Sequence, residues 1–235
     1  MSKKRVLITG GNKGIGLAVS RAMLELGHEI IIVAREFETC PLIGVKDVTA
    51  IECDLSKLDT LPALAKEVGD IDILINNAGY MQPKYTYDNY PVERRDNIMN
   101  VDLYAPVELM NIFSEHMKKQ KYGRIVNTAS IAGQIGHPDV WYGIAKAGLI
   151  NATKIYGKLL GSHGITVNCV APSPVETDMQ KDNSEERKKE FKKTVATGRF
   201  AEPEEIAKAI VWLATDCPEY INGICIDINN CSYPR

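Results

Sequence analysis

The sequence predicts an α/β fold, a single doubly wound domain in which a parallel sheet of seven strands is flanked by helices. Three observations predict it. Short apolar runs alternate with helix-length segments along the chain, the first run leads through a glycine-rich turn into a helix, and no linker, repeat or low-complexity stretch interrupts the alternation. A chain of 235 residues is long enough to bury a substantial core, so we expect one domain from 1 to 235.

The bulk composition argues against several classes of protein. The formal net charge is -2 at pH 7, so the chain lacks the basic field that attracts nucleic acid. No apolar run approaches the length of a membrane span, and the apolar start of the chain is too short for a signal peptide. The 6 cysteines lack the spacing of a metal site, which favours a cytoplasmic protein with free thiols and no metal.

The first strand and the first helix enclose a glycine-rich loop. Arg5–Thr9 is an apolar run suited to a buried parallel strand, and the amphipathic segment after the loop ends at Gly27. Between them, Gly10, Gly14 and Gly16 permit tight turning and close approach of a ligand. This layout aims backbone N–H groups and a helix N-terminus at a phosphate, as in Rossmann dinucleotide sites. Glycines that merely shape a turn would leave the same pattern.

The second strand, Glu29–Ala34, bears on the choice of cofactor. Sites of this kind that prefer NAD usually place an acidic residue after this strand, but here Ala34 and Arg35 occupy that place. The Arg35 guanidinium could bind a 2′-phosphate, and Lys13 in the glycine loop could reach the same group. These residues favour NADP(H) over NAD(H). Arg35 and Lys13 are each equally well explained as solvated surface charges, and the negative charge of Glu36 nearby weakens the positive potential that they would provide.

The next segments continue the alternation of strand and helix. The connection over 35–47 contains turn-forming proline and glycine and has little room for a crossover helix, so we expect a turn or a single helical turn. Val48–Cys53 is the predicted third strand, and Leu58–Val68 has helical periodicity. Asp54 lies between them. It could contact an adenine amino group or simply cap the backbone that follows.

The middle of the chain carries a further strand and a long helical pattern. Ile71–Ile75 is the predicted fourth strand and leads into Asn76–Gly79, whose small and amide residues suit a backbone lying against a flat ligand. Val92–Lys119 has the pattern of one long helix, with a potential kink at Pro106. Asn100 lies inside this pattern, where an asparagine is either exposed or carries its amide to a buried site.

Tyr142 and Lys146 form the most informative pair in the sequence. The fifth strand, Arg124–Thr128, leads to Ser130 and then to a predicted helix at Trp141–Gly161, on which residues four apart share a face. An ammonium beside a phenol favours the phenolate and lowers the phenol pKa toward the working range. Such a pair can transfer a proton to or from an oxygen of a substrate. Ordinary solvated helix faces carry the same spacing.

The last third of the chain completes the fold. It contains a sixth strand, a helix that begins after Pro203 and a seventh strand, at Ile165–Val170, Glu204–Ala214 and Ile224–Ile228. The mixed-charge segment 180–193 is either a mobile helical lid, spanning about 178–200, or a solvated helix face. Because the carboxyl ends of parallel strands meet at one edge, the loops that follow strands one, four, five and six should gather there.

In this order the motifs resemble those of the short-chain dehydrogenase/reductase family, most of all its 3-oxoacyl-[acyl-carrier-protein] reductases. The resemblance covers nearly the whole chain and is carried by Thr9, Gly10, Gly14–Gly16, Asn76–Gly79, Asn100, Ser130, Tyr142, Lys146, Asn168 and Pro172–Thr177. It implies an NAD(P)-dependent oxidoreductase acting on a carbonyl/alcohol pair, and Arg35 and Lys13 favour NADP(H) as its cofactor.

The resemblance also implies a role for each matching residue. Tyr142 would be the general acid in reduction, Lys146 would tune it and bind the nicotinamide ribose, and Ser130 would hold the substrate oxygen. Asn100 would support the proton relay, and Thr177 would meet the nicotinamide carboxamide. The implied cofactor residues are Thr9, Gly10, Asn12, Lys13, Gly14, Ile15, Gly16, Arg35, Asp54, Leu55, Asn77, Ala78, Gly79, Tyr142, Lys146, Pro172, Val175 and Thr177. The expected substrate residues are Ser130, Ala132, Gln134, His137, Trp141, Tyr142 and Pro174, together with the lid.

Two departures from the family pattern leave local structure open. Ser173 stands where a glycine is common, and Asn229–Asn230 replaces a usual glycine pair near the end of the chain.

The expected function is reduction of a ketone, of 3-oxoacyl thioester type. The alternatives are a dehydrogenase or reductase of a small alcohol, sugar, steroid or pterin, and a non-catalytic dinucleotide sensor. Expected partners are a small carbonyl substrate, either free or bound to an acidic carrier protein, and further copies of the chain in a dimer or tetramer, but neither nucleic acid nor a membrane.

Overall fold

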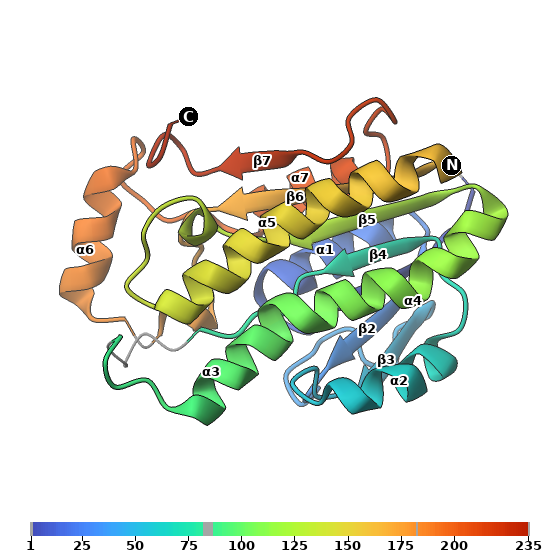
Figure 1. The fold of residues 1–235 in the computed structure, drawn as a ribbon, viewed down its shortest axis with the longest axis horizontal. Helices are drawn as coiled ribbons and strands as arrows, with labels where there is room; N and C mark the ends of the chain where they lie inside the picture. The colour runs from blue at the N-terminus through green and yellow to red at the C-terminus, as the bar shows by residue number, and fades with distance from the viewer. Residues whose placement is uncertain (1, 82–86, 182, 235) are drawn as a thin grey trace.

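A computed structural model of the protein describes residues 2–81, 87–181 and 183–234. Its strands form one parallel sheet in the order β3-β2-β1-β4-β5-β6-β7, which confirms the predicted doubly wound Rossmann fold (Figure 1). The strands are β1 (Arg5–Thr9), β2 (Glu29–Ala34), β3 (Val48–Glu52), β4 (Ile73–Asn76), β5 (Gly123–Thr128), β6 (Ile165–Pro172) and β7 (Cys225–Ile228). The order reverses between β1 and β4, and a doubly wound sheet binds its ligand at such a point.

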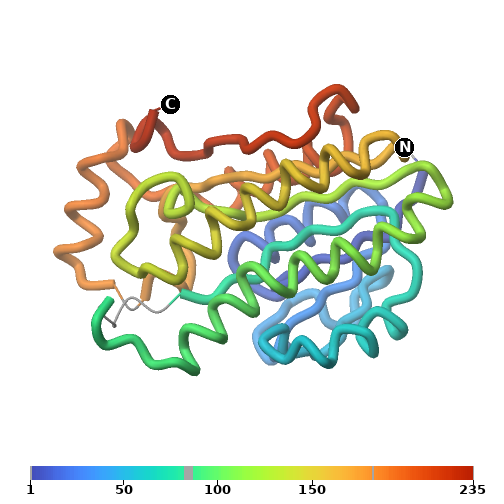
Figure 2. The backbone as a smooth tube through the Cα atoms, in the orientation of Figure 1, coloured from blue at the N-terminus to red at the C-terminus, as the bar shows by residue number. Residues whose placement is uncertain are grey.

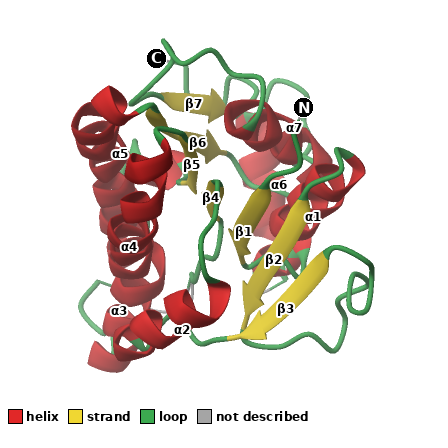
Figure 3. Cartoon of the chain, turned by 90° about the vertical axis from the view of Figure 1, so that its right-hand side faces the viewer, coloured by secondary structure: helices red, strands yellow, loops and turns green. Residues whose placement is uncertain are grey.

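Helices cover both faces of the sheet (Figure 3). The α-helices of the described chain are α1 (Gly14–Glu25), α2 (Leu61–Val68), α3 (Val92–Met99), α4 (Ala105–Gln120), α5 (Val140–Leu160), α6 (Glu185–Thr194) and α7 (Pro203–Ala214), of which α6 lies beyond the carboxyl ends of the strands. Alternate side chains of β1 point to opposite faces. Val6 and Ile8 pack in one cluster with residues of α1 and α7, whereas Leu7 packs in a second cluster with residues of α2, α4 and α5. Burial on both faces explains why the strands are continuous apolar runs.

The short second connection has the predicted form. Between β2 and β3 the described chain contains turns and no helix. Cys40 and Leu42 from this connection are buried against the core cluster that contains α1 and α7. All 6 cysteines are free thiols, as the sequence predicts.

The predicted long helix over Val92–Lys119 is interrupted, which corrects the sequence interpretation. It consists of α3, a π-helical turn at Asn100–Tyr104 and α4. Proline has no N–H to donate to the carbonyl four residues earlier, here that of Asp102, and its ring crowds that carbonyl. The wider π turn lies just before Pro106, and Pro106 itself occupies the first turn of α4, where a missing N–H costs little.

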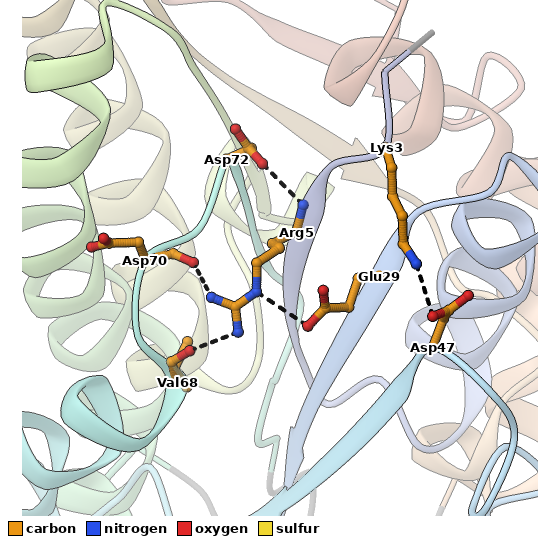
Figure 4. Close-up of polar contacts among 7 residues, drawn as sticks. All are labelled: Lys3, Arg5, Glu29, Asp47, Val68, Asp70 and Asp72. Carbon is orange, nitrogen blue, oxygen red and sulfur yellow. Dashed lines mark hydrogen bonds and ion pairs between the residues drawn. The ribbon is translucent and has the colours of Figure 1, made fainter.

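Arg5 forms hydrogen bonds that link neighbouring strands near their amino ends, at the edge of the sheet opposite the cavity side (Figure 4). Arg5 Nε donates to Glu29 Oε1 over 3.1 Å, and its Nη2 donates to the carbonyl oxygen of Val68 over 3.1 Å. A third donor of the guanidinium reaches the carbonyl of Asp70, and the Arg5 backbone N–H donates to Asp72 over 3.0 Å. These bonds join β1, β2, the end of α2 and the start of β4 at one point.

The C-terminal turn uses asparagine where the family pattern has glycine. Asn230 has a φ of 45° and Cys231 a φ of 59°, and asparagine enters this left-handed region at low cost. The Asn230 carbonyl accepts from the N–H of Ala196, and its side chain accepts from the N–H of Thr197 over 2.9 Å. The turn therefore holds the segment just after α6, and Figure 2 shows this end of the chain beside α6.

Ser173 also fits its place without strain. Its backbone N–H donates to the carbonyl of Ile228 over 3.0 Å, so it continues the pairing of β6 with β7. It is not among the residues with positive φ. A serine is therefore compatible with this loop. Within the described residues, no helix is both long and apolar enough to cross a membrane.

Candidate active site

A cavity of about 560 Å³ lies along the carboxyl ends of the strands. The cavity is lined by all four segments that were predicted to gather at this edge of the sheet. These are the glycine loop, the turn after β4, the turn after β5 and the segment after β6. Residues of α6 and the preceding turn add a further wall, and in Figure 1 α6 lies beyond these strand ends. The volume is within the range of sites for small molecules and cofactors.

The glycine loop has the shape that a phosphate site requires. Gly10 and Gly14 have φ of 65° and 53°, a region that favours glycine. A Cβ on Gly16 would lie 2.0 Å from the carbonyl oxygen of Gly10, so only glycine lets α1 start this close to β1. Helix α1 begins without a side-chain cap, which leaves the N–H groups of its first turn available to an anion.

Thr9 supports the loop from behind rather than lining the cavity. Its hydroxyl accepts hydrogen bonds from the N–H groups of Asn77 and Ala78, over 3.0 and 3.1 Å. The Asn77 amide donates to the carbonyls of Thr9 and Gly10. Thus the turn after β4 is tied to the glycine loop, and both segments face the same space.

The far end of the cavity carries the residues expected to discriminate between cofactors. Lys13, Arg35 and Glu36 all line it. Lys13 Nζ lies 3.2 Å from Glu36 Oε1, so the lysine forms an ion pair with the carboxylate that would oppose binding of a 2′-phosphate. Arg35 is exposed at the end of β2. Two cations and one carboxylate therefore border the position after β2.

Asp54 makes the capping contacts that the sequence left as one of two interpretations. Its Oδ1 accepts from the backbone N–H of Ser56 over 3.0 Å and from the Ser56 hydroxyl over 2.8 Å. Burial raises the pKa of this carboxyl, but these hydrogen bonds and the nearby Arg35 bring the pKa below its ordinary value overall. Asp54 and its buried neighbour Leu55 both line the cavity, so a role beside a bound ligand is compatible with the cap.

Tyr142 and Lys146 occupy the other half of the cavity, and both are buried. This excludes the solvated helix face as an explanation of the pair. Asp139, the N-cap residue of α5, accepts from the Tyr142 backbone N–H over 3.2 Å and so fixes the start of the helix. The Lys146 ammonium lies 5.6 Å from the centre of the Tyr142 ring.

The Lys146 ammonium is held by two oxygens of the protein. Its Nζ donates to the carbonyl oxygen of Thr128, at the end of β5, over 2.9 Å. It also lies 2.9 Å from Oδ1 of Asp102, a carboxylate with no exposed surface. An ammonium has three N–H donors, so one further bond can be made to a ligand.

The electrostatic environment of Tyr142 differs from the sequence expectation. Burial raises the pKa of its phenol, and the Asp102 charge adds to that rise. The Lys146 charge and a hydrogen bond with Ser130 oppose it, but the pKa remains above its ordinary value. For Lys146, burial lowers the pKa, but the charge of Asp102, the interaction with Tyr142 and a hydrogen bond with Asp102 together raise it above its ordinary value. In this structure the phenol therefore holds its proton and the lysine its charge.

Ser130 and His137 complete the surroundings of Tyr142. The Ser130 hydroxyl accepts from the N–H of Ala132 over 3.1 Å, and its hydrogen bond with Tyr142 lowers the phenol pKa. The rings of His137 and Tyr142 lie 5.5 Å apart between centres. Burial lowers the pKa of His137, so this ring is neutral around pH 7. A serine and a tyrosine hydroxyl thus converge at the cavity surface, where they can both bind one substrate oxygen.

Asn100 and Asp102 come from the π turn between α3 and α4. The Asn100 amide donates to the carbonyl of Ser56 over 2.8 Å, and among the described residues Asn100 is not part of the cavity lining. The side chain of this turn that reaches Lys146 is Asp102. Asp102 was not among the predicted site residues, and its one signal in the sequence is an acidic residue inside an otherwise apolar stretch.

The predicted substrate residues divide into two groups. Ser130, Ala132, His137, Tyr142 and Pro174 line the cavity. Gln134 and Trp141 are not in the described lining. The Gln134 amide donates to Asp227 of β7 over 2.7 Å, and the Trp141 ring faces the Arg95 guanidinium at 5.6 Å.

Eight further residues line the substrate side: Tyr80, Met81, Arg94, Ile135, Met179, Arg187, Phe191 and Phe200. Met179, Arg187, Phe191 and Phe200 belong to the predicted lid at about 178–200. Tyr80 and Met81 belong to an aromatic-rich loop, 80–91, that the sequence offers either as a pocket wall or as a loop packed on the surface, and of which 82–86 lie outside the described residues. Arg94 and Ile135 were not predicted, because no periodic pattern marks them and the fold brings them to the cavity.

The segment after β6 closes one side of the glycine loop. A Cβ on Gly14 would lie 3.1 Å from Cγ2 of Thr177, so these two residues are in close contact. The Thr177 hydroxyl donates to the carbonyl of Val175 over 3.4 Å. Pro172, Val175 and Thr177 all line the cavity, as do Gly10, Asn12, Ile15 and Gly79.

The sequence of this chain matches those of a known protein family over nearly its whole length. A family model described as enoyl-(acyl carrier protein) reductase matches residues 10–230. The 3-oxoacyl-[acyl-carrier-protein] reductase FabG of Haemophilus influenzae is 33% identical, with 99% of each chain covered. FabG of Vibrio harveyi is 34% identical, over 98% of this chain and 97% of that protein.

Two solved structures have the same fold. One is described as a short chain dehydrogenase/reductase family protein, with a TM-score of 0.89, 27% identity and 97% of each chain covered. The other is a 4-hydroxyisoleucine dehydrogenase complexed with NADH, with a TM-score of 0.93 and 24% identity over 98% of this chain and 99% of that chain. At that identity the second likeness concerns the fold alone.

Proposed function

Because the chain belongs to the short-chain dehydrogenase/reductase family of oxidoreductases, we propose that it reduces a ketone to a secondary alcohol with NADPH, using Tyr142 as the proton donor. The observation that carries the proposal is the burial of Tyr142 and Lys146 in a cavity that begins at the glycine loop. A site with this layout places an acid next to the reactive end of a bound dinucleotide. The proposed substrate is a 3-oxoacyl thioester, as the names of the FabG relatives indicate for those proteins.

The residues present fit a dinucleotide. The left-handed glycines and the uncapped start of α1 suit its phosphates. Gly79 faces the other half of the cavity, where a Cβ would lie 3.2 Å from Asp102 Oδ1 and 3.7 Å from Lys146 Nζ. A glycine at this point leaves room for a sugar ring beside the lysine. The remaining N–H of Lys146 would bind a ribose hydroxyl there.

The proposed chemistry divides between the cofactor and the chain. The bound nicotinamide supplies a hydride to the carbonyl carbon. The hydroxyls of Ser130 and Tyr142 donate hydrogen bonds to the carbonyl oxygen as negative charge develops on it. Tyr142 then delivers its proton to that oxygen, and the Lys146 ammonium stabilises the phenolate that remains. A phenol that is protonated before the reaction, as in this structure, is in the correct state for this role.

NADPH is favoured over NADH by charge. Arg35 follows β2, where a 2′-phosphate would lie, and the chain has no carboxylate at positions 34 and 35 to bind a 2′-hydroxyl. Lys13 could turn from Glu36 to the same phosphate, since an exposed ion pair of this kind is weak. Glu36 would then be the main obstacle to NADPH selectivity.

The experiment that tests the function is a substrate screen. Purified protein with NADPH is mixed with 3-oxoacyl thioesters, diketones, sugars, steroids and pterins, and consumption of NADPH is followed by absorbance. The proposal predicts turnover with ketones and the highest kcat/KM with a 3-oxoacyl thioester. Preference for another ketone would overturn the substrate assignment, and binding of NADPH without turnover of any compound would favour a sensor.

A further inference from the structure

Asp102 is a fully buried acid beside Lys146, and the reaction described above gives it no role. Its side chain has no exposed surface. Oδ1 lies 2.9 Å from Lys146 Nζ, and Oδ2 accepts from the backbone N–H of Tyr80 over 2.9 Å. One carboxylate thus joins the π turn, helix α5 and the loop after β4.

The π turn accounts for the position of this carboxylate. Its first residue, Asn100, is fixed by the hydrogen bond to Ser56, and Pro106 follows in the first turn of α4. Between these two points the helix widens, and Asp102 is directed to the interior although the neighbouring Leu103 and Tyr104 are less buried. Single π turns of this kind occur frequently at functional sites.

A buried carboxylate is costly unless it is paired, and this pair has consequences for its neighbours. The positive charge of Lys146 is the main charge near Tyr142 that favours the phenolate. Asp102 neutralises that charge at close range. The Asp102 charge also acts directly on Tyr142 and raises the pKa of the phenol, so removing this charge should make the phenol more acidic.

The groups that face Tyr142 come from every element packed around it. They are Asp102 from the π turn, Asp139 and Lys146 from α5, Ser130 from the turn after β5, and His137, Tyr80 and Tyr90 from the loops, with Arg187 of α6 near His137. Asp139 also carries negative charge, but its effect on Tyr142 is smaller than that of Asp102. His137 is held neutral by burial. Asp102 is therefore the acid with the largest influence on the phenol.

We propose that Asp102 is a positioning residue, whose buried carboxylate fixes the Lys146 ammonium beside Tyr142 and offsets its positive charge there. The carboxylate holds Nζ between the end of β5 and the glycine turn after β4. It thereby extends the pH range in which Tyr142 has a proton to donate. The consequence for catalysis rests on the proposed function, whereas the effect on the phenol itself does not.

The direct test follows the ionisation of Tyr142 in the protein without substrate. Tyrosine ring carbons are isotope-labelled, the Tyr142 signal is assigned by its loss in Tyr142→Phe, and its NMR shift is titrated with pH. In Asp102→Asn, which keeps the size and the hydrogen-bond acceptor but removes the charge, Tyr142 should ionise at a pH lower by about one unit or more. An unchanged or higher titration midpoint would overturn the proposal.

Asp72→Asn is the matched control. Asp72 accepts a hydrogen bond from Arg5 at the opposite edge of the sheet (Figure 4), so the loss of its charge should leave the Tyr142 titration unchanged. If Asp102→Asn does not fold, Asp102→Ser removes the same charge and leaves room for a water to solvate Lys146. The same downward shift is expected in that variant, and the same absence of a shift would contradict the proposal.

Turnover gives a second and separable readout. In the wild type, kcat/KM for ketone reduction should fall on the alkaline side as Tyr142 loses its proton, and in Asp102→Asn this fall should occur at lower pH. A merely structural role would reduce the rate without moving the profile. If the wild type reduces no ketone, the proposed function fails, but the NMR titration still decides the role of Asp102.

Discussion

At the scale of single residues, the site depends on how charge is arranged around one phenol. Sequence spacing alone places Tyr142 and Lys146 on one helix face, and the structure adds that both are buried. Burial reverses the expected direction of the pKa of Tyr142, because desolvation outweighs the nearby ammonium. Spacing cannot reveal this, since it contains no information about solvent access.

Cofactor preference is also decided by single residues. We expect Arg35→Ala to weaken NADPH binding by roughly tenfold or more, because it removes a charge-assisted bond to the 2′-phosphate, and to leave NADH nearly unchanged. Titration calorimetry with both cofactors measures this. Arg21→Ala, an exposed arginine on α1 outside the cavity lining, serves as the control. Equal losses for the two cofactors would contradict the role of Arg35.

At the scale of elements, the strands and most helices could be predicted, whereas the π turn could not. Apolar runs locate β1 and β2 at the predicted bounds because parallel strands buried on both faces leave a continuous signal. The helical pattern over Val92–Lys119 looks unbroken in the sequence, since a π turn adds only one residue to a turn and preserves apolar character. Asp102 was missed for the same reason, because its direction depends on that turn.

The start of α5 is an element whose contribution to stability can be measured. Asp139 caps the helix by accepting from the Tyr142 N–H, so Asp139→Ala should lower the free energy of unfolding by about 1 kcal/mol. Urea denaturation measures the change. Asp139→Asn keeps a capping oxygen and should lose less. Equal stability of the alanine variant and the wild type would show that the cap contributes nothing.

At the scale of the whole molecule, the doubly wound topology accounts for the position of the site. The sheet order reverses between β1 and β4, and the loops that follow β1, β4, β5 and β6 line one cavity. Strand order and this convergence follow from general rules for parallel sheets, so they could be predicted. On the substrate side the lid segment could be predicted, but the individual side chains that line the cavity could not, because the loop and α6 residues carry no periodic signal. Gln134 illustrates this, since Asp227 holds its side chain elsewhere.

The outer face of α5 bears on assembly. Ile144, Ile155 and Leu159 are exposed and follow one stripe of the helix. We expect this stripe, with α4, to join copies of the chain in a dimer or tetramer, because exposed apolar side chains in a row favour burial. Light scattering after gel filtration should find an oligomer for the wild type and a smaller species for Leu159→Glu. A monomeric wild type would contradict this expectation.

The most direct test of the central claim is the substitution Tyr142→Phe, which removes only the phenolic hydroxyl. The kcat for ketone reduction should fall by roughly 10²–10⁴-fold, the usual contribution of a general acid, while NADPH affinity stays within a few-fold. Tyr220→Phe, at a fully exposed position, should retain wild-type kcat. If Tyr142→Phe keeps substantial activity with the substrate that the wild type reduces, Tyr142 is not the proton donor.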